Sequence, residues 1–174
     1  MQILETDRLI LRHLSLDEDA EFILQLVNEP SWLKFIGDKS VRTLEDARAY
    51  ILNGPLEMYS RLGFGLYLVE LKEAGVSIGM CGLIKRDSLA DVDIGFAFLP
   101  QYWGRGYAYE AAAAVLAYGR NAHDLKRIVA ITSVDNDSSV RLLEKLGLSF
   151  EGMVKLTNDS EEIRLYGANF PDKS

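Results

Sequence analysis

The order of predicted elements indicates a mixed α/β fold, in which helices pack on a central sheet. Two β-rich runs, residues 64–71 and 76–85, are separated by the turn Glu73-Ala74-Gly75 and predict an antiparallel hairpin. Segments with the apolar spacing of helices lie both before and after this hairpin. Because strands and helices do not alternate strictly, a doubly wound parallel sheet is not expected.

The segment before the hairpin predicts one strand and two helices. Residues 8–14 are expected to form the strand. Ser15-Leu16-Asp17-Glu18 has the pattern of a capping box and is expected to open the first helix. Thr43-Leu44-Glu45-Asp46 opens the second helix in the same way, and Gly54-Pro55 is expected to end it.

The segment after the hairpin predicts four more strands and two more helices. Pro100 ends the first of these strands, and Gly147 closes the last helix in the usual position for a glycine. The expected elements are a strand at 92–99, a helix at about 105–121, a strand at 127–132, a helix at 138–146, and strands at 148–154 and 162–170.

Length and composition predict one domain spanning residues 1–174, with a core over about residues 5–170. The chain has 174 residues, of which 48% are hydrophobic and 26% charged, as in ordinary globular proteins. The net charge of −7 argues against a nucleic-acid or anionic-membrane partner. No run approaches the ~20 apolar residues that span a bilayer, and residues 1–8 lack the apolar stretch of a signal peptide. A single cysteine, Cys81, fits a reducing, cytoplasmic location.

The most informative segment is the turn between strand 92–99 and the long helix. Gly104 and Gly106 allow a tight turn that presents several backbone N–H groups at a helix N-terminus, where they bind an anion such as a pyrophosphate. A dinucleotide fingerprint is not matched, because Tyr109 stands where a third glycine is required, and the Gly-Lys-Ser/Thr of a P-loop is absent. The alternative is that the two glycines serve the geometry of the turn alone.

Three segments resemble the GNAT (GCN5-related) N-acetyltransferase family. Gln101-x-x-Gly104-x-Gly106-x-Ala108 is similar to its signature for the pyrophosphate of acetyl-CoA, and the segment from Asn136 to Leu148 is similar to its next strand-to-helix segment. Glu5 to Arg12 and Trp103 to Ala108 resemble the branch that acetylates ribosomal-protein N-termini. The resemblance covers roughly residues 5–170 in the family's order.

The resemblance implies a mostly antiparallel, twisted sheet that splays at one parallel strand pair and holds acetyl-CoA as cosubstrate. The backbone of Phe98 and Leu99 is expected to bind the pantetheine arm as an added strand would. Asn136 matches the family asparagine that bonds the same arm; the alternative is a plain helix N-cap. The remaining expected cofactor-binding residues are Gln101, Gly104, Arg105, Gly106, Tyr107 and Ala108.

Two residues are candidates for the chemistry. Strand alternation places Asp93 on the same face as Gly95 and Ala97, which suggests space for a ligand, and Asp93 stands where the branch often has a glutamate. We expect it to accept the amine proton, through water; the alternative is a solvated residue at the start of the strand. Many family members have a tyrosine acid where this chain has Leu143, so Ser139, which matches the serine proposed in the ribosomal-protein branch, is the candidate acid. Its alternative is a serine that caps backbone N–H groups.

The resemblance also implies an amine acceptor, either a protein N-terminus or a small molecule. Trp32 and Phe35 lie where the family's acceptor-binding loop falls; the alternative is packing in a core or lid. No metal is expected, because His13 and His123 lack partners at ligand spacing. The expected function is acetyl transfer to a primary amine by direct attack in a ternary complex. The alternatives are a non-catalytic acyl-CoA-binding module and a nucleotide-binding regulatory module. The chain is expected to be a monomer or a homodimer.

Overall fold

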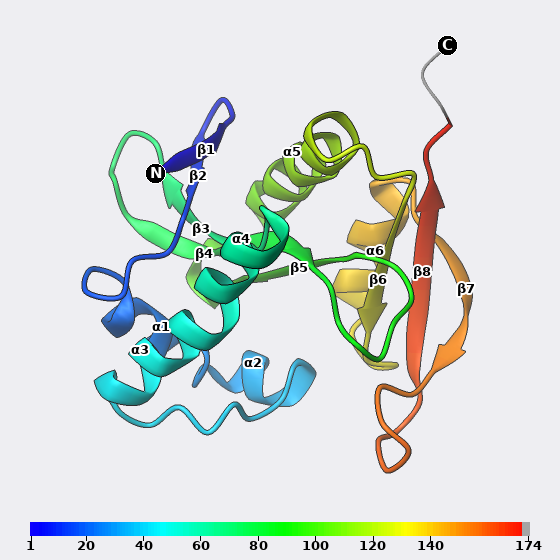
Figure 1. Ribbon diagram of the computed structural model, residues 1–174, viewed down its shortest axis with the longest axis horizontal. Coiled ribbons are helices and arrows are strands. Elements are labelled where there is room, and N and C mark those ends of the chain that lie inside the picture. The colour runs from blue at the N-terminus through cyan, green and yellow to red at the C-terminus, as the bar shows by residue number, and fades with distance from the viewer. Residues whose placement is uncertain (172–174) are drawn as a thin grey trace.

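A computed structural model describes residues 1–171 and contains one eight-stranded sheet of order β1-β2-β3-β4-β5-β6-β8-β7 (Figure 1). Neighbouring strands are antiparallel except β5 and β6, which are parallel. The expected mixed α/β sheet with one parallel pair is therefore confirmed. The strands are β1 (Gln2–Glu5), β2 (Leu9–Arg12), β3 (Leu66–Leu71), β4 (Ser77–Ile84), β5 (Asp93–Phe98), β6 (Arg127–Thr132), β7 (Ser149–Val154) and β8 (Ile163–Asn169).

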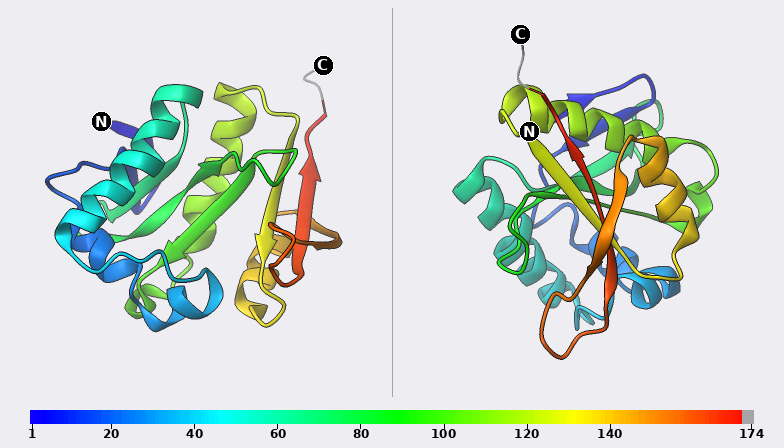
Figure 2. Two further views of the ribbon diagram at one scale, coloured as in Figure 1. Left: turned by 60° about the horizontal axis from the view of Figure 1, so that its bottom comes forward. Right: turned by 90° about the vertical axis from the view of Figure 1, so that its right-hand side faces the viewer.

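Helices cover both faces of the sheet, as the right-hand view of Figure 2 shows. On one face α5 (Tyr107–Ala122) and α6 (Asp137–Lys145) pack on a cluster that includes Cys81, Ile94 and Phe98. On the other face α1 (Ala20–Leu26), α2 (Pro30–Phe35) and α3 (Leu44–Ile51) pack on Leu68 and Met80. The two clusters contain buried apolar side chains from alternate positions of the same strands, as a sheet covered on both faces requires.

The parallel strands β5 and β6 separate soon after they meet. Their register has one partner pair, Asp93 with Val129, where Val129 N donates to Val92 O at 2.9 Å. Beyond that pair the two strands run apart in Figure 1. This divergence interrupts the hydrogen-bonded ladder in the middle of the sheet and exposes part of the β5 edge.

The first helix begins later than the capping box at Ser15 predicts. Glu18 N does donate to Ser15 Oγ at 3.4 Å, but α1 starts at Ala20, with Asp19 as its N-cap. The buried Asp19 carboxylate instead accepts from Ser15 N at 2.7 Å and from both Nη atoms of Arg12 at 2.9 Å. These bonds stabilise a turn over residues 15–19, so the prediction was wrong by about one helical turn.

The second helix does not stop at Gly54-Pro55. Thr43 and Asp46 form the predicted capping box, but after α3 the chain continues through a π-helical turn, Leu52–Leu56, into α4 (Glu57–Leu62). The wider π turn accommodates Pro55, which lacks the N–H of a normal helical residue. The actual end is Gly63, whose φ of 80° is the left-handed conformation common at helix C-termini.

The remaining elements agree with the predicted segments within one or two residues, whereas β1 and the short α2 were not predicted. Both are four to six residues long, so they carry little periodicity. Among residues 1–171, no helix has the length and apolarity needed to cross a membrane.

Candidate active site

Two cavities adjoin where β5 and β6 diverge. The larger, of about 790 Å³, lies between the N-terminal ends of α5 and α6, and the smaller, of about 410 Å³, lies on the side of α3 and the β4–β5 loop. Residues of α2, β5 and β6 line both cavities: Trp32, Phe35, Ile36, Phe96, Ala97, Ile131 and Thr132. A ligand in one cavity therefore lies next to a ligand in the other.

The glycine turn forms one end of the larger cavity. Gly104 and Gly106 adopt φ values of 74° and 82°, a left-handed conformation that other residues adopt only with strain. Helix α5 begins at Tyr107, and no side chain caps it. Its first amides have no helical acceptor and face a cavity lined by Gly104, Gly106, Tyr107 and Ala108, which suits an anionic group.

Arg8 supports this turn from the other end of the chain. Its Nη1 donates to Arg105 O at 2.9 Å, and its guanidinium lies 4.4 Å from the centre of the Tyr107 ring. Its Nε pairs with Glu110 Oε1 at 2.8 Å in the first turn of α5. These contacts hold the turn in one conformation, and sequence reasoning had not assigned Arg8 any role.

The cationic side chains at the larger cavity are not the predicted ones. Gln101 and Arg105 are exposed and do not line it. Arg141 and Lys145 of α6 do, and Lys145 Nζ lies 4.3 Å from the centre of the Tyr109 ring. Their spacing of four residues places them on one face of α6, a signal that was available in the sequence.

The backbone of β5 is open toward β6 at Phe96 and Phe98, but not at Leu99. Leu99 N donates to Ile78 O at 2.9 Å, so the alternation of an antiparallel pair turns the N–H and C=O of Phe96 and Phe98 away from β4. The Phe98 carbonyl accepts from Trp103 Nε1 at 2.9 Å. Leu99 O accepts from Tyr102 N at 3.0 Å and Leu99 lines neither cavity, so its expected part in cofactor binding does not fit this geometry.

Asn136 and Ser139 both line the larger cavity at the start of α6. Asn136 is the N-cap, and its Oδ1 accepts from Ser139 N at 3.3 Å, so the N-cap interpretation of Asn136 is confirmed. Ser139 itself does not cap the helix, because its hydroxyl accepts no backbone N–H within residues 1–171. Its Oγ is thus available to a ligand.

Asp93 lines the smaller cavity and is buried, with 1% of its side chain exposed. The alternative of a solvated residue is therefore wrong. Arg86 Nε donates to both carboxylate oxygens, at 3.3 and 3.4 Å. Burial nevertheless outweighs the charge of Arg86 and raises the pKa of Asp93 to about 6. Gly95 and Ala97 line the cavity beside it, and so do Ile94 and Phe96 from the alternate positions of the strand.

Trp32 lies at the junction of the two cavities. Helix α2 positions it, and its side chain is almost wholly buried, with 5% of the residue exposed. Its Nε1 has no hydrogen-bond partner in the described part of the chain. A buried donor without a partner is costly, so the indole N–H is available for a ligand that enters between the cavities. Phe35 lines both cavities from the same helix.

Comparison with known proteins decides the family. Residues 8–149 match the family model described as an acetyltransferase (GNAT) domain, which is most of the chain. The chain belongs to the GNAT acetyltransferase family. It is 34% identical over 155 residues to YoaA of Bacillus subtilis (strain 168), an uncharacterized N-acetyltransferase; the match covers 88% of this chain and 86% of that protein.

Solved GNAT structures share the fold over nearly the whole chain. A GNAT-family acetyltransferase from Bacillus anthracis is 27% identical with a TM-score of 0.78, covering 97% of this chain and 98% of that one. RimL, a ribosomal L7/L12 alpha-N-protein acetyltransferase solved with coenzyme A, is 17% identical with a TM-score of 0.72, and 98% of each chain is covered. The protein is thus an acetyltransferase enzyme with the GNAT fold.

The GNAT site contains polar residues that the sequence did not single out. Lys39, Tyr50 and Arg86 line the smaller cavity with Asp93, but they come from three separate segments. Only the tertiary fold brings them together, and nothing in their local patterns signals it. Leu143 is buried at 1% exposure beneath this cavity, so the position that the family often fills with tyrosine carries no hydroxyl here.

Proposed function

We propose that the protein transfers the acetyl group of acetyl-CoA directly to a primary amine, with both substrates bound together. The observation that carries this proposal is the adjacency of the two cavities at Trp32, Phe96 and Ala97. A cofactor in the larger cavity and an amine in the smaller one meet there, without a covalent enzyme intermediate. Holding both reactants in contact supplies much of the rate for an already reactive thioester.

The larger cavity fits coenzyme A. The uncapped amides at the start of α5, from Gly106 to Ala108, suit the pyrophosphate. Arg141 and Lys145 add local positive charge, in a lining that also contains the carboxylates of Glu29, Asp135 and Asp137. The open edge of β5, at the N–H and C=O of Phe96 and the N–H of Phe98, offers backbone hydrogen bonds to the amides of pantetheine. Support comes also from RimL, which has the same fold and was solved with coenzyme A.

Asp93 acts as the general base in this proposal. A pKa of about 6 makes its carboxylate more basic than an ordinary aspartate, while it remains mostly ionised at neutral pH. The acceptor ammonium gives one proton to Asp93, through a bridging water, and the freed nitrogen lone pair forms a bond to the thioester carbon. The nitrogen then loses a second proton to water. The bond from that carbon to sulfur then breaks, and its electron pair leaves with the sulfur.

Two further groups complete the reaction. The unpartnered Trp32 Nε1 donates a hydrogen bond to the thioester oxygen as negative charge develops on it. The departing thiolate takes the hydroxyl proton of Ser139, which regains one from solvent. The acceptor amine is a protein N-terminus, as in the ribosomal-protein branch that the sequence resembles, or a small molecule. A cytoplasmic location stays a prediction from composition.

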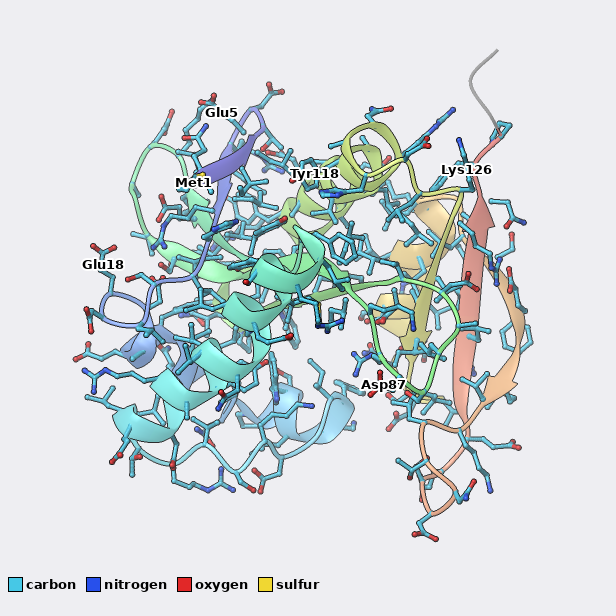
Figure 3. All side chains as sticks on the ribbon, viewed as in Figure 1. Met1, Glu5, Glu18, Asp87, Tyr118 and Lys126 are labelled. Atoms are coloured by element: carbon cyan, nitrogen blue, oxygen red, sulfur yellow. The ribbon has the colours of Figure 1, made fainter. Side chains whose placement is uncertain are left out.

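The test measures release of free CoA thiol from acetyl-CoA across a panel of amines and N-terminal peptides. We expect turnover with at least one acceptor, and loss of turnover in Asp93→Asn with binding of CoA retained. Asp87→Asn is the matched control, because Asp87 is an exposed carboxylate in the loop next to Arg86 (Figure 3). Binding of CoA without turnover on any amine would instead indicate an acyl-CoA-binding module, and stabilisation by ATP or NAD but not by CoA a nucleotide-binding one.

A further inference from the structure

We propose that the acceptor is a small aminocarboxylate with an apolar side chain, whose carboxylate binds between Lys39 and Arg86. The inference rests on the proposed function, since it names the amine that occupies the smaller cavity. This acceptor differs from a purely cationic amine, the acceptor that the net charge of −7 favours.

The smaller cavity has an excess of positive charge. Its ionisable lining consists of Lys39, Tyr50, Arg86 and Asp93, so two cations face one carboxylate. Burial raises the pKa of Tyr50 to about 12, against the opposing charge of Arg86, and the phenol therefore stays neutral. At neutral pH the cavity carries about one net positive charge, which an acceptor carboxylate would neutralise.

Both cations keep donors free for a ligand. Within residues 1–171, Lys39 makes no ion pair or hydrogen bond. Although part of its side chain is exposed, the pKa of its ammonium is lowered by burial and then by repulsion from Arg86. Arg86 uses only Nε for Asp93, which leaves both Nη atoms without a partner in the described chain. A guanidinium presenting two free N–H groups matches the geometry of a carboxylate.

The same arrangement positions the amine. Arg86 contacts Asp93 on one side, so a carboxylate held by its Nη atoms lies close to the proposed base. In an α-amino acid the amine is only one carbon away from the carboxylate, which places it within reach of Asp93. The two charged ends of the acceptor then complement the two signs of charge at this end of the cavity.

The rest of the cavity lining is mostly apolar, with the hydroxyls of Thr132 and Ser133 among its polar groups. Its volume of about 410 Å³ fits a small molecule, and its walls are aliphatic or thioether side chains: Pro55, Met58, Leu66, Met80, Ile84, Leu156 and Ile163. An apolar side chain is therefore favoured over a charged one. The acidic residues that give the chain its net charge of −7 include Glu5 and Glu18, which point outward near β1 and the loop before α1 (Figure 3). They do not face this cavity.

The test compares three acceptors that share one side chain: L-leucine, L-leucinamide, and a tripeptide beginning with leucine. We expect kcat/KM for leucine to exceed that for leucinamide by at least tenfold. If the reactivity of the amine alone decided the rate, leucinamide would be acetylated faster than leucine, because its amine has the lower pKa. Equal or better turnover of leucinamide or the tripeptide would overturn this inference and leave the acetyltransferase proposal standing. Absence of turnover on every amine would overturn both.

Variants locate the carboxylate site. Lys39→Gln should raise KM for leucine severalfold and leave KM for leucinamide unchanged, a split that a general folding defect does not produce. Arg86→Gln should also raise KM for leucine, but it removes the partner of Asp93 and should therefore lower kcat for both acceptors. Lys72→Gln is the control, since it makes the same charge change at an exposed lysine that pairs with Glu5. An equal rise of KM for both acceptors in Lys39→Gln would count against the site.

Discussion

Arg86 Nε lies 3.3 Å from Oδ1 and 3.4 Å from Oδ2 of Asp93, at the start of the strand where the parallel pair diverges. The pair is asymmetric, because 1% of the aspartate side chain and 33% of the arginine side chain are exposed. Burial therefore controls the carboxylate, and the guanidinium reaches into a ligand cavity. This one contact links the proposed base to the proposed acceptor site.

The Asp93 carboxylate predicts an acid limb in the pH profile. Because its pKa is raised to about 6, a base that must be ionised is lost as pH falls through that value. We expect kcat/KM of the wild type to drop below pH 6. Asp93→Asn should lower kcat/KM by about 10²–10⁴-fold at neutral pH and lack the step at pH 6. The same step in the variant would show that another group titrates there.

Gly106 is predicted to serve both conformation and cofactor binding. Alanine at this position would be strained at φ 82°, and its Cβ would lie 3.2 Å from Arg8 Nη2. Gly106→Ala should lower the free energy of unfolding by about 1–2 kcal/mol and raise KM for acetyl-CoA. Gly75→Ala is matched in conformation, with φ 65° and nothing within 4 Å, but lies in the β3–β4 turn. It should lower stability in chemical denaturation and leave KM unchanged.

The cations of α6 are predicted to bind coenzyme A more strongly than Arg105 does. Arg141→Gln and Lys145→Gln should each weaken CoA binding severalfold in calorimetry, and the loss should shrink at high salt because screening weakens these contacts. Arg105→Gln should leave the affinity nearly unchanged, since this residue is exposed and does not line the cavity. The reverse ranking would restore the expectation drawn from the sequence.

Substitution of Ser139 is predicted to affect catalysis, and substitution of Asn136 to affect stability. Ser139→Ala should lower kcat with little change in Tm, because its hydroxyl caps no backbone group. Asn136→Ala should cost about 1 kcal/mol of stability through loss of the N-cap. Thermal melts and steady-state kinetics on both variants check this division. A Tm loss in Ser139→Ala with unchanged kcat would assign the serine a structural role.

Trp32 is predicted to act through its indole N–H. Trp32→Phe keeps an aromatic ring at the junction and removes a buried donor that has no partner. We expect kcat to fall by about 10²-fold, while the loss of stability is only that of a smaller buried ring, because no hydrogen bond within residues 1–171 is broken. Trp103→Phe removes a bonded indole instead, the one that donates to Phe98 O, and should destabilise the end of β5.

The sequence predicted correctly those elements whose hydrophobic periodicity extends over many residues. The long helix after the glycine turn and the hairpin of β3 and β4 appear where periodicity and turn residues placed them. The errors came where an interaction or a backbone conformation outside the short motif overrode it. Asp19 pairs with Arg12 of β2 and delays α1, and a π turn carries the helix past Pro55. A motif of adjacent residues does not contain such information.

Much of the proposed cofactor site could be predicted from the sequence, because residues close together in the chain form it. Gly104 and Gly106 have positive φ values, which favour glycine, and the backbone amides at the start of the following helix need no side chain to bind an anion. Asn136 at the next helix start follows the same local rule. By itself the sequence thus determined the fold class, the family resemblance and the position of the glycine turn at the start of α5.

The tertiary structure decided the burial of Asp93, the exposure of Arg105 and the charges of the acceptor cavity. Lys39, Tyr50 and Arg86 lie in segments that are far apart in the chain and meet only in the folded protein. The electrostatic interaction among them therefore depends on packing and not on sequence spacing. Net charge cannot predict the charges of one cavity for the same reason, because electrostatic interactions depend on distance and burial while a sum over the chain contains neither.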